Sequence, residues 1–230
     1  MNNQTEYQHY ISFIRENFPQ SAYLLSEEGL VKKLFTCIHN SLIISDIFSS
    51  IRSLNSVCTL LLADQKLIYL KTLYTLPNND DFQFYSIMRA NVENLLRILL
   101  CAFKPEITYQ EVKETSFSQL NELLDMTYLN QKYKVELSEL YSYFGTFSKN
   151  IHRISLEKNT NLFLKEMMTK TLEPKSLETK IKSLKKIKNI LVYVFLDVYK
   201  VKSGSFDTPQ LSKLHSILGE AEYEKLPLFE

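Results

Sequence analysis

Apolar residues recur every three or four positions along most of this chain, a spacing that places them on one face of an α-helix. The most apolar such stretch, residues 81–103, carries them around most of its circumference, so we expect it to be a central, buried helix. The pattern therefore predicts an all-α protein. Its other helices are expected over 5–18, 30–51, 57–76, 116–126, 132–153, 175–199 and 209–218.

Turn residues and capping side chains set the expected ends of these helices. Ser26, followed by two glutamates, is the expected N-cap of the second helix. A break is expected near Asn55, and the turn at 77–81 ends in aspartates that can cap the central helix. The remaining stretches are predicted as a loop or short helix at 106–115, a loop at 156–161, a short helix at 162–168, a linker at 201–206 and a frayed tail at 223–230.

The end of the helix predicted over 175–199 is rich in β-branched and aromatic residues, which also favour a strand. Since no partner strand is evident elsewhere in the chain, the helix is the preferred interpretation. The predicted elements group into three parts: N-terminal helices that pack on or extend the core (1–76), a helical core (77–200), and a linker, short helix and tail (201–230).

Composition narrows the class of protein further. With 230 residues, 45% of them apolar, the chain can bury one substantial core. Only four glycines and six prolines argue against an all-β or Rossmann-type chain, which needs many turns. A formal net charge of +1 gives no global attraction to nucleic acid or membrane, so any such binding needs a local patch.

Expectations for localisation and cofactors follow from motifs that the sequence lacks. No apolar run approaches a membrane span, and the N-terminus has no secretory signal. The three widely spaced cysteines are expected to be buried free thiols in a reducing cytoplasm. Phosphate-loop, HExxH, CxxC and GxSxG motifs are absent, and carboxylates do not cluster at metal-ligand spacing. We therefore expect a cytoplasmic protein without a membrane segment, metal or cofactor.

Two charged residues interrupt the apolar pattern of the central helix. Arg89 and Glu93 are one turn apart, the spacing of an i,i+4 ion pair. On a helical wheel, Arg89 projects between Leu96 and Leu100, inside the apolar arc. A charged pair in that position must satisfy itself or find a third partner, so it marks a candidate polar site.

A histidine near the end of the next long helix is the second candidate. His152 lies at the border of an apolar stripe, with Gly145 two turns before it on the same side. Glycine in a helix interior costs about 1 kcal/mol relative to alanine, and close approach by another helix or a ligand would explain it there. The histidine is either a structural residue at a core border or part of a functional site.

These residues together resemble the HEPN superfamily, the all-α domains of bacterial toxin–antitoxin, abortive-infection and other defence proteins. The resemblance covers roughly 79–199, and it implies a four-helix core, frequent homodimers and, in active members, a metal-independent endoribonuclease. The residues that carry it are Arg89 and Glu93 in an Arg-x3-Glu pair, then Tyr141, Ser148, Lys149, Asn150 and His152 on the later helix.

Two functional interpretations follow from the resemblance. Active members of the family carry an arginine four to six residues before the histidine, where this chain has Gly145, Thr146 and Phe147. In the first interpretation Arg89 faces the phosphate instead and His152 is the acid or base, so the protein is a defence or toxin-type endoribonuclease. In the alternative, Arg89, Glu93 and His152 form a structural cluster in a non-catalytic helical module that binds a protein, a nucleic acid or a small ligand.

Basic residues supply the candidate RNA contacts. Lysines concentrate in the helix predicted over 175–199, where they form a solvated face or hold phosphates. RNA, a protein partner such as an antitoxin, and a second copy of the chain are the expected partners. The candidate RNA-binding residues are Lys149, Asn150, Arg153, Lys182, Lys185 and Lys186.

Overall fold

The computed structural model describes residues 3–153 and 172–228, and for Asn3, His152 and Arg153 it describes the backbone alone. Every regular element within these ranges is helical, as the pattern predicts. Three 3₁₀ turns, at Ala22–Leu25, Leu76–Asn78 and Ser203–Ser205, connect longer elements. The α-helices are α1 (Asn3–Asn17), α2 (Glu28–Ser49), α3 (Ser56–Thr75), α4 (Asp81–Cys101), α5 (Tyr109–Glu114), α6 (Phe117–Asp125), α7 (Leu129–Lys132), α8 (Lys134–Arg153), α10 (Pro174–Val198), α11 (Thr208–Leu218) and α12 (Glu220–Tyr223).

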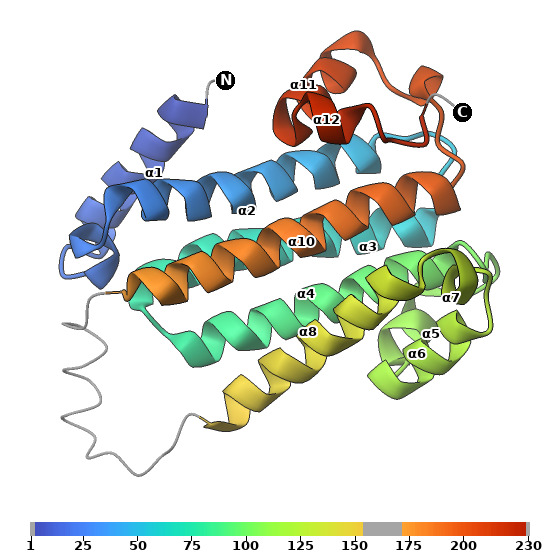
Figure 1. The fold of residues 1–230 in the computed structure, drawn as a ribbon, viewed down its shortest axis with the longest axis horizontal. Coiled ribbons are helices and arrows are strands. Elements are labelled where there is room, and N and C mark those ends of the chain that lie inside the picture. Colours follow the sequence, from blue (N-terminus) through green and yellow to red (C-terminus); the bar gives the residue numbers. More distant parts are fainter. Residues whose placement is uncertain (1–2, 154–171, 229–230) are drawn as a thin grey trace.

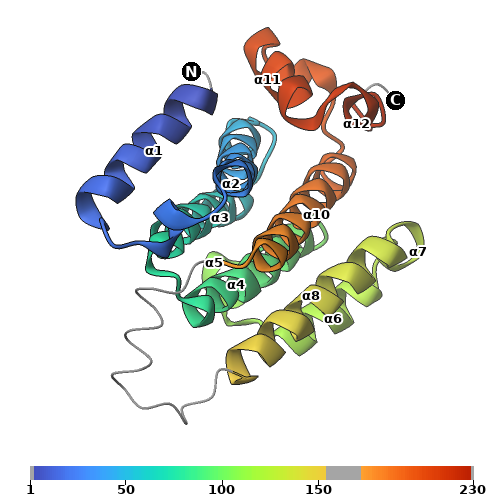
Figure 2. The same ribbon diagram turned by 60° about the vertical axis from the view of Figure 1, so that its left-hand side comes forward.

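Five long helices form the body of the molecule (Figures 1 and 2). Helices α2, α3, α4 and α8 pack side by side in chain order, each antiparallel to the next, and α10 packs against α2, α4 and α8. Helix α1 flanks α2, while α5 and α6 cover α4. The C-terminal helices α11 and α12 lie above α2 and α10 in Figure 1.

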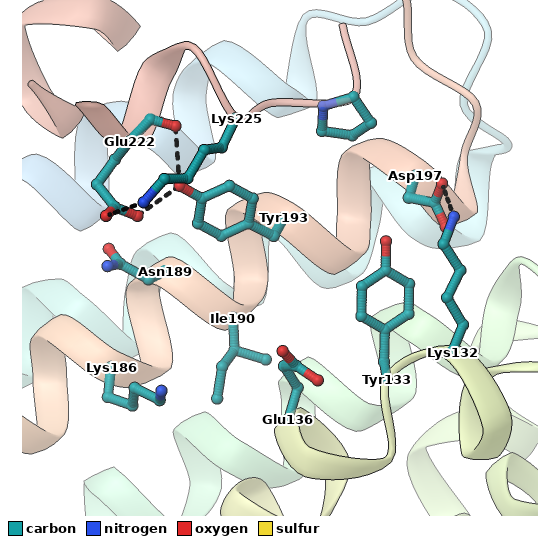
Figure 3. Close-up of a pocket in the computed structure, with 11 residues that line it drawn as sticks. Lys132, Tyr133, Glu136, Lys186, Asn189, Ile190, Tyr193, Asp197, Glu222 and Lys225 are labelled. Atoms are coloured by element: carbon teal, nitrogen blue, oxygen red, sulfur yellow. Dashed lines mark hydrogen bonds and ion pairs between the residues drawn. The ribbon is translucent and has the colours of Figure 1, made fainter. Parts of the chain in front are cut away.

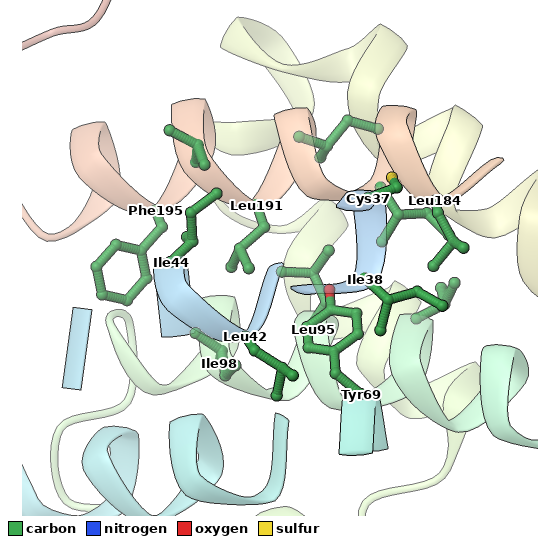
Figure 4. Packing of buried hydrophobic residues seen from close by; sticks show 14 of the residues in the cluster. Cys37, Ile38, Leu42, Ile44, Tyr69, Leu95, Ile98, Leu184, Leu191 and Phe195 are labelled. Carbon is green, nitrogen blue, oxygen red and sulfur yellow. The ribbon is translucent and has the colours of Figure 1, made fainter. Parts of the chain in front are cut away.

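The central helix is buried as its sequence predicts. Phe84, Met88, Val92, Leu95 and Leu99 are each at most 3% exposed. Leu95 lies among side chains of α2, α3 and α10 in Figure 4, so α4 is the centre of the core. Burial of each such side chain contributes about 1.5–3 kcal/mol to folding.

Helix α10 is continuous, which confirms the preference for helix over strand in its apolar second half. Its residues from Ile190 to Val198 are buried at almost every position, against α2 on one side and α4 on the other. Phe195 stacks on Phe48 of α2, with ring centroids 4.4 Å apart and planes 7° apart. The surrounding core therefore overrides the weak helix propensity of β-branched residues.

The predicted break near Asn55 and the predicted cap of the central helix are both present. The Asn55 side chain accepts a hydrogen bond from the Cys58 amide at 2.7 Å and begins α3 after the predicted break. The Asp80 carboxylate accepts one from the Gln83 amide at 3.1 Å and begins α4. The ambiguous stretch before α6 contains α5, which a capping box between Thr108 and Glu111 starts.

Two local predictions are wrong. Ser26 does not cap α2, because its hydroxyl donates to the Ala22 carbonyl at 2.7 Å and accepts from the Leu172 amide at 3.3 Å. The described part of the tail is not frayed, because Leu226 and Leu228 are each only 2% exposed and pack on the core. The predicted loop at 156–161 and helix at 162–168 lie outside the described residues.

The structure also bears on the predictions about cysteines and about membrane-spanning segments. Cys37, Cys58 and Cys101 are free and buried, as predicted. In the described ranges, no helix combines the length and the apolar character that crossing a membrane requires.

Candidate functional site

Arg89 contacts an aromatic ring rather than a carboxylate. It is half-buried on α4, and its guanidinium carbon lies 4.7 Å from the centroid of the Phe144 ring on α8. The Phe117 ring of α6 stacks on the Phe144 ring, with the two centroids 3.5 Å apart. The cation–π contact therefore helps to join α4 to α8, and such contacts contribute about 0.5–2 kcal/mol.

Glu93 is bound by Arg97, not by Arg89. Its Oε1 lies 2.7 Å from Arg97 Nη2, and the two side chains are 22% and 11% exposed. Arg97 also donates to three backbone carbonyls at the α5–α6 connection: those of Val112 at 2.9 Å, Lys113 at 3.1 Å and Thr115 at 3.3 Å. The expected Arg89–Glu93 pair is therefore wrong. A signal for the observed pair was present, because glutamate four residues before a cation is the favoured order on a helix.

The side chains of His152 and Arg153 lie outside what the structure describes, so their predicted roles stay predictions. Helices α4 and α8 are antiparallel, since Tyr85 stacks near Phe147 with centroids 6.1 Å apart while Arg89 lies over Phe144. The backbone of His152 is thus eight residues beyond the contact with Arg89, about 12 Å along the helix axis.

Three other candidates on α8 are described. Lys149 is exposed and Asn150 is half-buried, and their roles as RNA contacts stay predictions. No described helix approaches Gly145 closely, because a Cβ added there would meet no atom within 4 Å. That half of the interpretation is wrong for the described part of the chain, and close approach by a ligand stays a prediction.

Lys182, Lys185 and Lys186 are exposed on α10, but their environments differ. Lys186 Nζ lies 3.1 Å from Glu139 Oε2 of α8, so its charge is compensated. Lys182 and Lys185 form no ion pair with any residue that the structure describes. These two are therefore the better candidates for phosphate contacts on this helix.

The lysine pattern of α10 predicts one exposed set, which forms a solvated face or holds phosphates, yet two of these lysines are buried. Lys180 is 5% exposed, with its Nζ 2.7 Å from Asp81 Oδ1 and 4.8 Å from the centroid of the Phe84 ring. Lys188 is 8% exposed, and no described residue forms an ion pair with it. Burying a lysine without a counterion costs folding free energy, so the surroundings of Lys188 are a candidate binding site for an anion.

Lys188 lines an open cavity of about 600 Å³ between α2, α10 and the end of α11, which we name the lysine hollow. Four lysines stand in its wall, two from α2 and two from α10, and no described residue of the wall is acidic. Its lining residues are Gly29, Lys32, Lys33, Thr36, Cys37, Asn40, Lys185, Lys188, Asn189, Ile217 and Leu218.

Burial governs the electrostatics of the lysine hollow. It lowers the pKa of the Lys188 ammonium, an effect that the nearby Lys185 charge reinforces and that Cys37 and Glu222 oppose. Burial also raises the pKa of the Cys37 thiol to about 11, so this neighbour is a neutral thiol at neutral pH. The wall of the lysine hollow therefore carries excess positive charge that an anion would neutralise.

A second cavity, of about 480 Å³, lies on the other side of α10 and contrasts with the first (Figure 3). Its charges are compensated within its own wall: Lys132 pairs with Asp197 at 2.7 Å and Lys225 with Glu222 at 3.2 Å. Tyr193 also donates to the backbone carbonyl of Glu222 at 2.8 Å. The wall of this cavity therefore carries no excess of positive or negative charge, unlike the wall of the lysine hollow.

Metal chemistry has no support from the described side chains. Within 3–153 and 172–228, histidine, cysteine and acidic residues do not form a group of three that could hold a metal ion. The arrangement supports binding of an anion at the lysine hollow instead. Compared with known protein families, curated proteins and solved structures, the chain shows no match.

Proposed function

We propose that this protein binds RNA, with phosphates of the RNA backbone held in the lysine hollow. The observation that carries the proposal is Lys188, a buried side chain without an ion-pair partner among the described residues, which lines a cavity with three further lysines. A phosphate bound there would be attracted by these lysines, and neutralisation of phosphates by lysine and arginine contributes a large, salt-dependent part of the affinity for nucleic acids.

The surroundings of the lysine hollow suit a polynucleotide. Along the exposed side of α10, Lys182 and Lys175 continue the positive surface beyond Lys185, interrupted by the carboxylate of Glu178. The wall also offers the amide of Asn189, which can bond to a base edge or to the 2′-hydroxyl that distinguishes RNA from DNA. The proposed contacts thus include Lys182 and Lys185, two of the residues that the sequence indicates.

In this proposal Arg89, Glu93 and Arg97 are structural. Arg89 joins α4 to α8, and the Glu93–Arg97 pair fixes the α5–α6 connection to α4. A helical binding module is also the alternative interpretation of the sequence. The cluster expected there joined Arg89, Glu93 and His152, whereas in the structure Glu93 pairs with Arg97. A HEPN-like identity, a defence role and an antitoxin partner stay predictions that the resemblance supports.

The test is RNA binding measured by fluorescence anisotropy with a labelled single-stranded RNA. Lys188→Met, which removes the charge but keeps the length of the side chain, is expected to weaken binding by about tenfold or more. Lys186→Met is the matched control on the same helix, because the Lys186 charge is already paired with Glu139, and it should change affinity by less than about twofold.

Two further arms define the ligand. A DNA of the same sequence is expected to bind more weakly than the RNA, and inorganic tripolyphosphate is expected to compete with the RNA. If the wild type binds no RNA at concentrations of about 100 µM, or if both lysine variants bind as the wild type does, the proposal is wrong.

RNA cleavage is a separate prediction of the family resemblance, and it depends on His152. A catalytic imidazole would make His152→Ala lose cleavage by about two to four orders of magnitude while RNA binding persists. The measurement is the recovery of intact labelled RNA in a chelator-containing buffer. If the wild type and His152→Ala leave equal amounts of intact RNA, the prediction of a catalytic His152 is wrong, and RNA binding without cleavage is the proposed activity.

A further inference from the structure

Helix α3 carries a row of exposed apolar residues on the face that points away from the core. Leu60, Leu67, Leu70 and Tyr74 are 49%, 48%, 46% and 58% exposed, and Ala63 between them is also exposed. We call these five residues the α3 seam. Exposed apolar side chains are common singly, whereas a continuous row of them along a helix indicates an interaction surface.

The opposite face of α3 already packs in the core, so the seam is not explained by the fold of one copy. Leu62, Gln65, Tyr69 and Thr72 face α2 and α4 and are at most 1% exposed. A helix that is apolar on two opposite faces normally has neighbours on both. Two elements reach the flanks of this side of α3: Tyr109 of α5 donates to Asp64 at 2.7 Å, and Tyr10 of α1 donates to the Leu73 carbonyl at 2.6 Å.

The spacing within the seam is that of a coiled coil. Its five residues are three, four, three and four positions apart, which is the a/d pattern of two heptads. At one end of the seam, the Tyr74 ring contacts the Phe18 ring, with centroids 5.9 Å apart. Phe18 in turn contacts Phe13, with centroids 6.0 Å apart. Such a seam accepts another helix with the same repeat.

We propose that the seam binds a second copy of this chain, with the two α3 helices antiparallel about a two-fold axis near Leu67 and Leu70. In the a-to-d register of such a pair, Leu67 meets Leu70 of the other copy and Tyr74 lies over Ala63. The largest seam side chain thus faces the smallest, so the surface is complementary to itself in size, as a two-fold interface requires.

Charges beside the seam select this orientation. Lys66, which pairs with Asp46 of α2 at 2.6 Å, and Lys71 flank it on opposite edges. A parallel pair would bring Lys66 of one copy toward Lys71 of the other. An antiparallel pair brings Lys71 toward Asp64 instead. Asp64 uses Oδ2 to bind Tyr109 at 2.7 Å and Lys113 at 3.1 Å, so its Oδ1 faces no hydrogen-bond partner among the described residues.

This dimer differs from one in which two His152 regions share a groove. Helix α3 packs between α2 and α4, while α8 lies on the far side of α4 (Figures 1 and 2). Pairing through α3 therefore keeps both α8 helices and both lysine hollows on the outside of the assembly, accessible to ligands. The seam spans a helix about 30 Å long, which gives a small interface and hence a weak, concentration-dependent dimer.

The first experiment is sedimentation equilibrium of the full chain between about 1 and 200 µM. The wild type is expected to rise from 27.0 kDa toward twice that mass, whereas Leu67→Glu stays at 27.0 kDa. Met126→Glu is the matched control, because Met126 is an 81% exposed apolar residue outside the seam, and it should associate as the wild type does. Near-ultraviolet circular dichroism confirms that both variants remain folded. A wild type that stays monomeric throughout, or a dimer that Leu67→Glu leaves intact, overturns the proposal.

The second experiment tests orientation with cysteines and a short bismaleimide cross-linker. The three native cysteines are buried, so they contribute little background. A mixture of Ala63→Cys and Tyr74→Cys proteins is expected to cross-link as a pair, while each protein alone cross-links poorly. Efficient cross-linking of Ala63→Cys to itself would show parallel helices and would contradict the antiparallel assignment.

Discussion

Glu93 Oε1 lies 2.7 Å from Arg97 Nη2, which assigns the carboxylate of the central helix to the arginine that follows it rather than to the one that precedes it. Arg97 fixes the α5–α6 connection at the same time, through carbonyls of Val112 and Thr115. Arg89 is left to its contact with the Phe144 ring. The two arginines of α4 therefore have different structural duties, and substitutions separate them.

Arg97→Met is expected to destabilise the protein by about 2–4 kcal/mol, because it leaves Glu93 partly buried without a counterion and frees backbone carbonyls at α5–α6. Arg89→Met serves as the control and should cost only about 1 kcal/mol, the value of its cation–π contact. Urea unfolding of both variants measures the difference. Equal losses would show that Arg89 carries a buried interaction of similar weight.

Lys188→Met is expected to raise the free energy of unfolding by about 1–2 kcal/mol at neutral pH. The substitution removes a buried charge that has no ion-pair partner in the described part of the chain and keeps most of the side-chain volume. Lys186→Met, on the exposed side of α10, should change stability by less than about 0.5 kcal/mol. Thermal unfolding at low phosphate concentration makes the comparison. A strong loss of stability in Lys188→Met would mean that its ammonium is satisfied in the folded state.

Stability should also depend on pH through Lys188. Its pKa is lowered in the folded protein, so between that pKa and the ordinary lysine value of 10.5 the unfolded chain binds more protons. Stability therefore rises with pH across this window. Lys185 repels the charge and Glu222 favours it, whereas Cys37 favours it only once its thiol ionises. Lys32 and Lys33 lie in the same cavity wall. Lys188→Met should flatten the profile, and an unchanged profile would contradict the assignment.

His39 predicts a second dependence, at acid pH. Burial lowers its pKa from 6.5, its ring stacks on Phe35 with centroids 5.4 Å apart, and its Nδ1 is buried without a hydrogen-bond partner among the described residues. Since the unfolded chain takes up the proton first, stability falls as the pH drops below about 6.5. His39→Phe should remove that part of the loss, measured by urea unfolding at about pH 5 and pH 7. Parallel losses in both proteins would assign the effect to other groups.

The sequence predicted the helices well because their apolar periodicity is a local property, and α4 shows this most clearly. The sequence-based assignment of partners was less successful. For Glu93 two arginines were available at the same spacing, and only the packing of α5 and α6 on α4 decides between them. Periodicity also cannot show that Lys188 faces two lysines of α2, which lie about 150 residues away in the chain.

The most direct test of the central claim is photo-cross-linking of a 4-thiouridine RNA to the wild-type protein, followed by mapping of the cross-linked peptides. The proposal predicts cross-links in α2 and α10 around the lysine hollow, at residues near Lys33 and Lys185, and their loss in Lys188→Met. Cross-links concentrated on α3 or α8, with a pattern that Lys188→Met leaves unchanged, would contradict it.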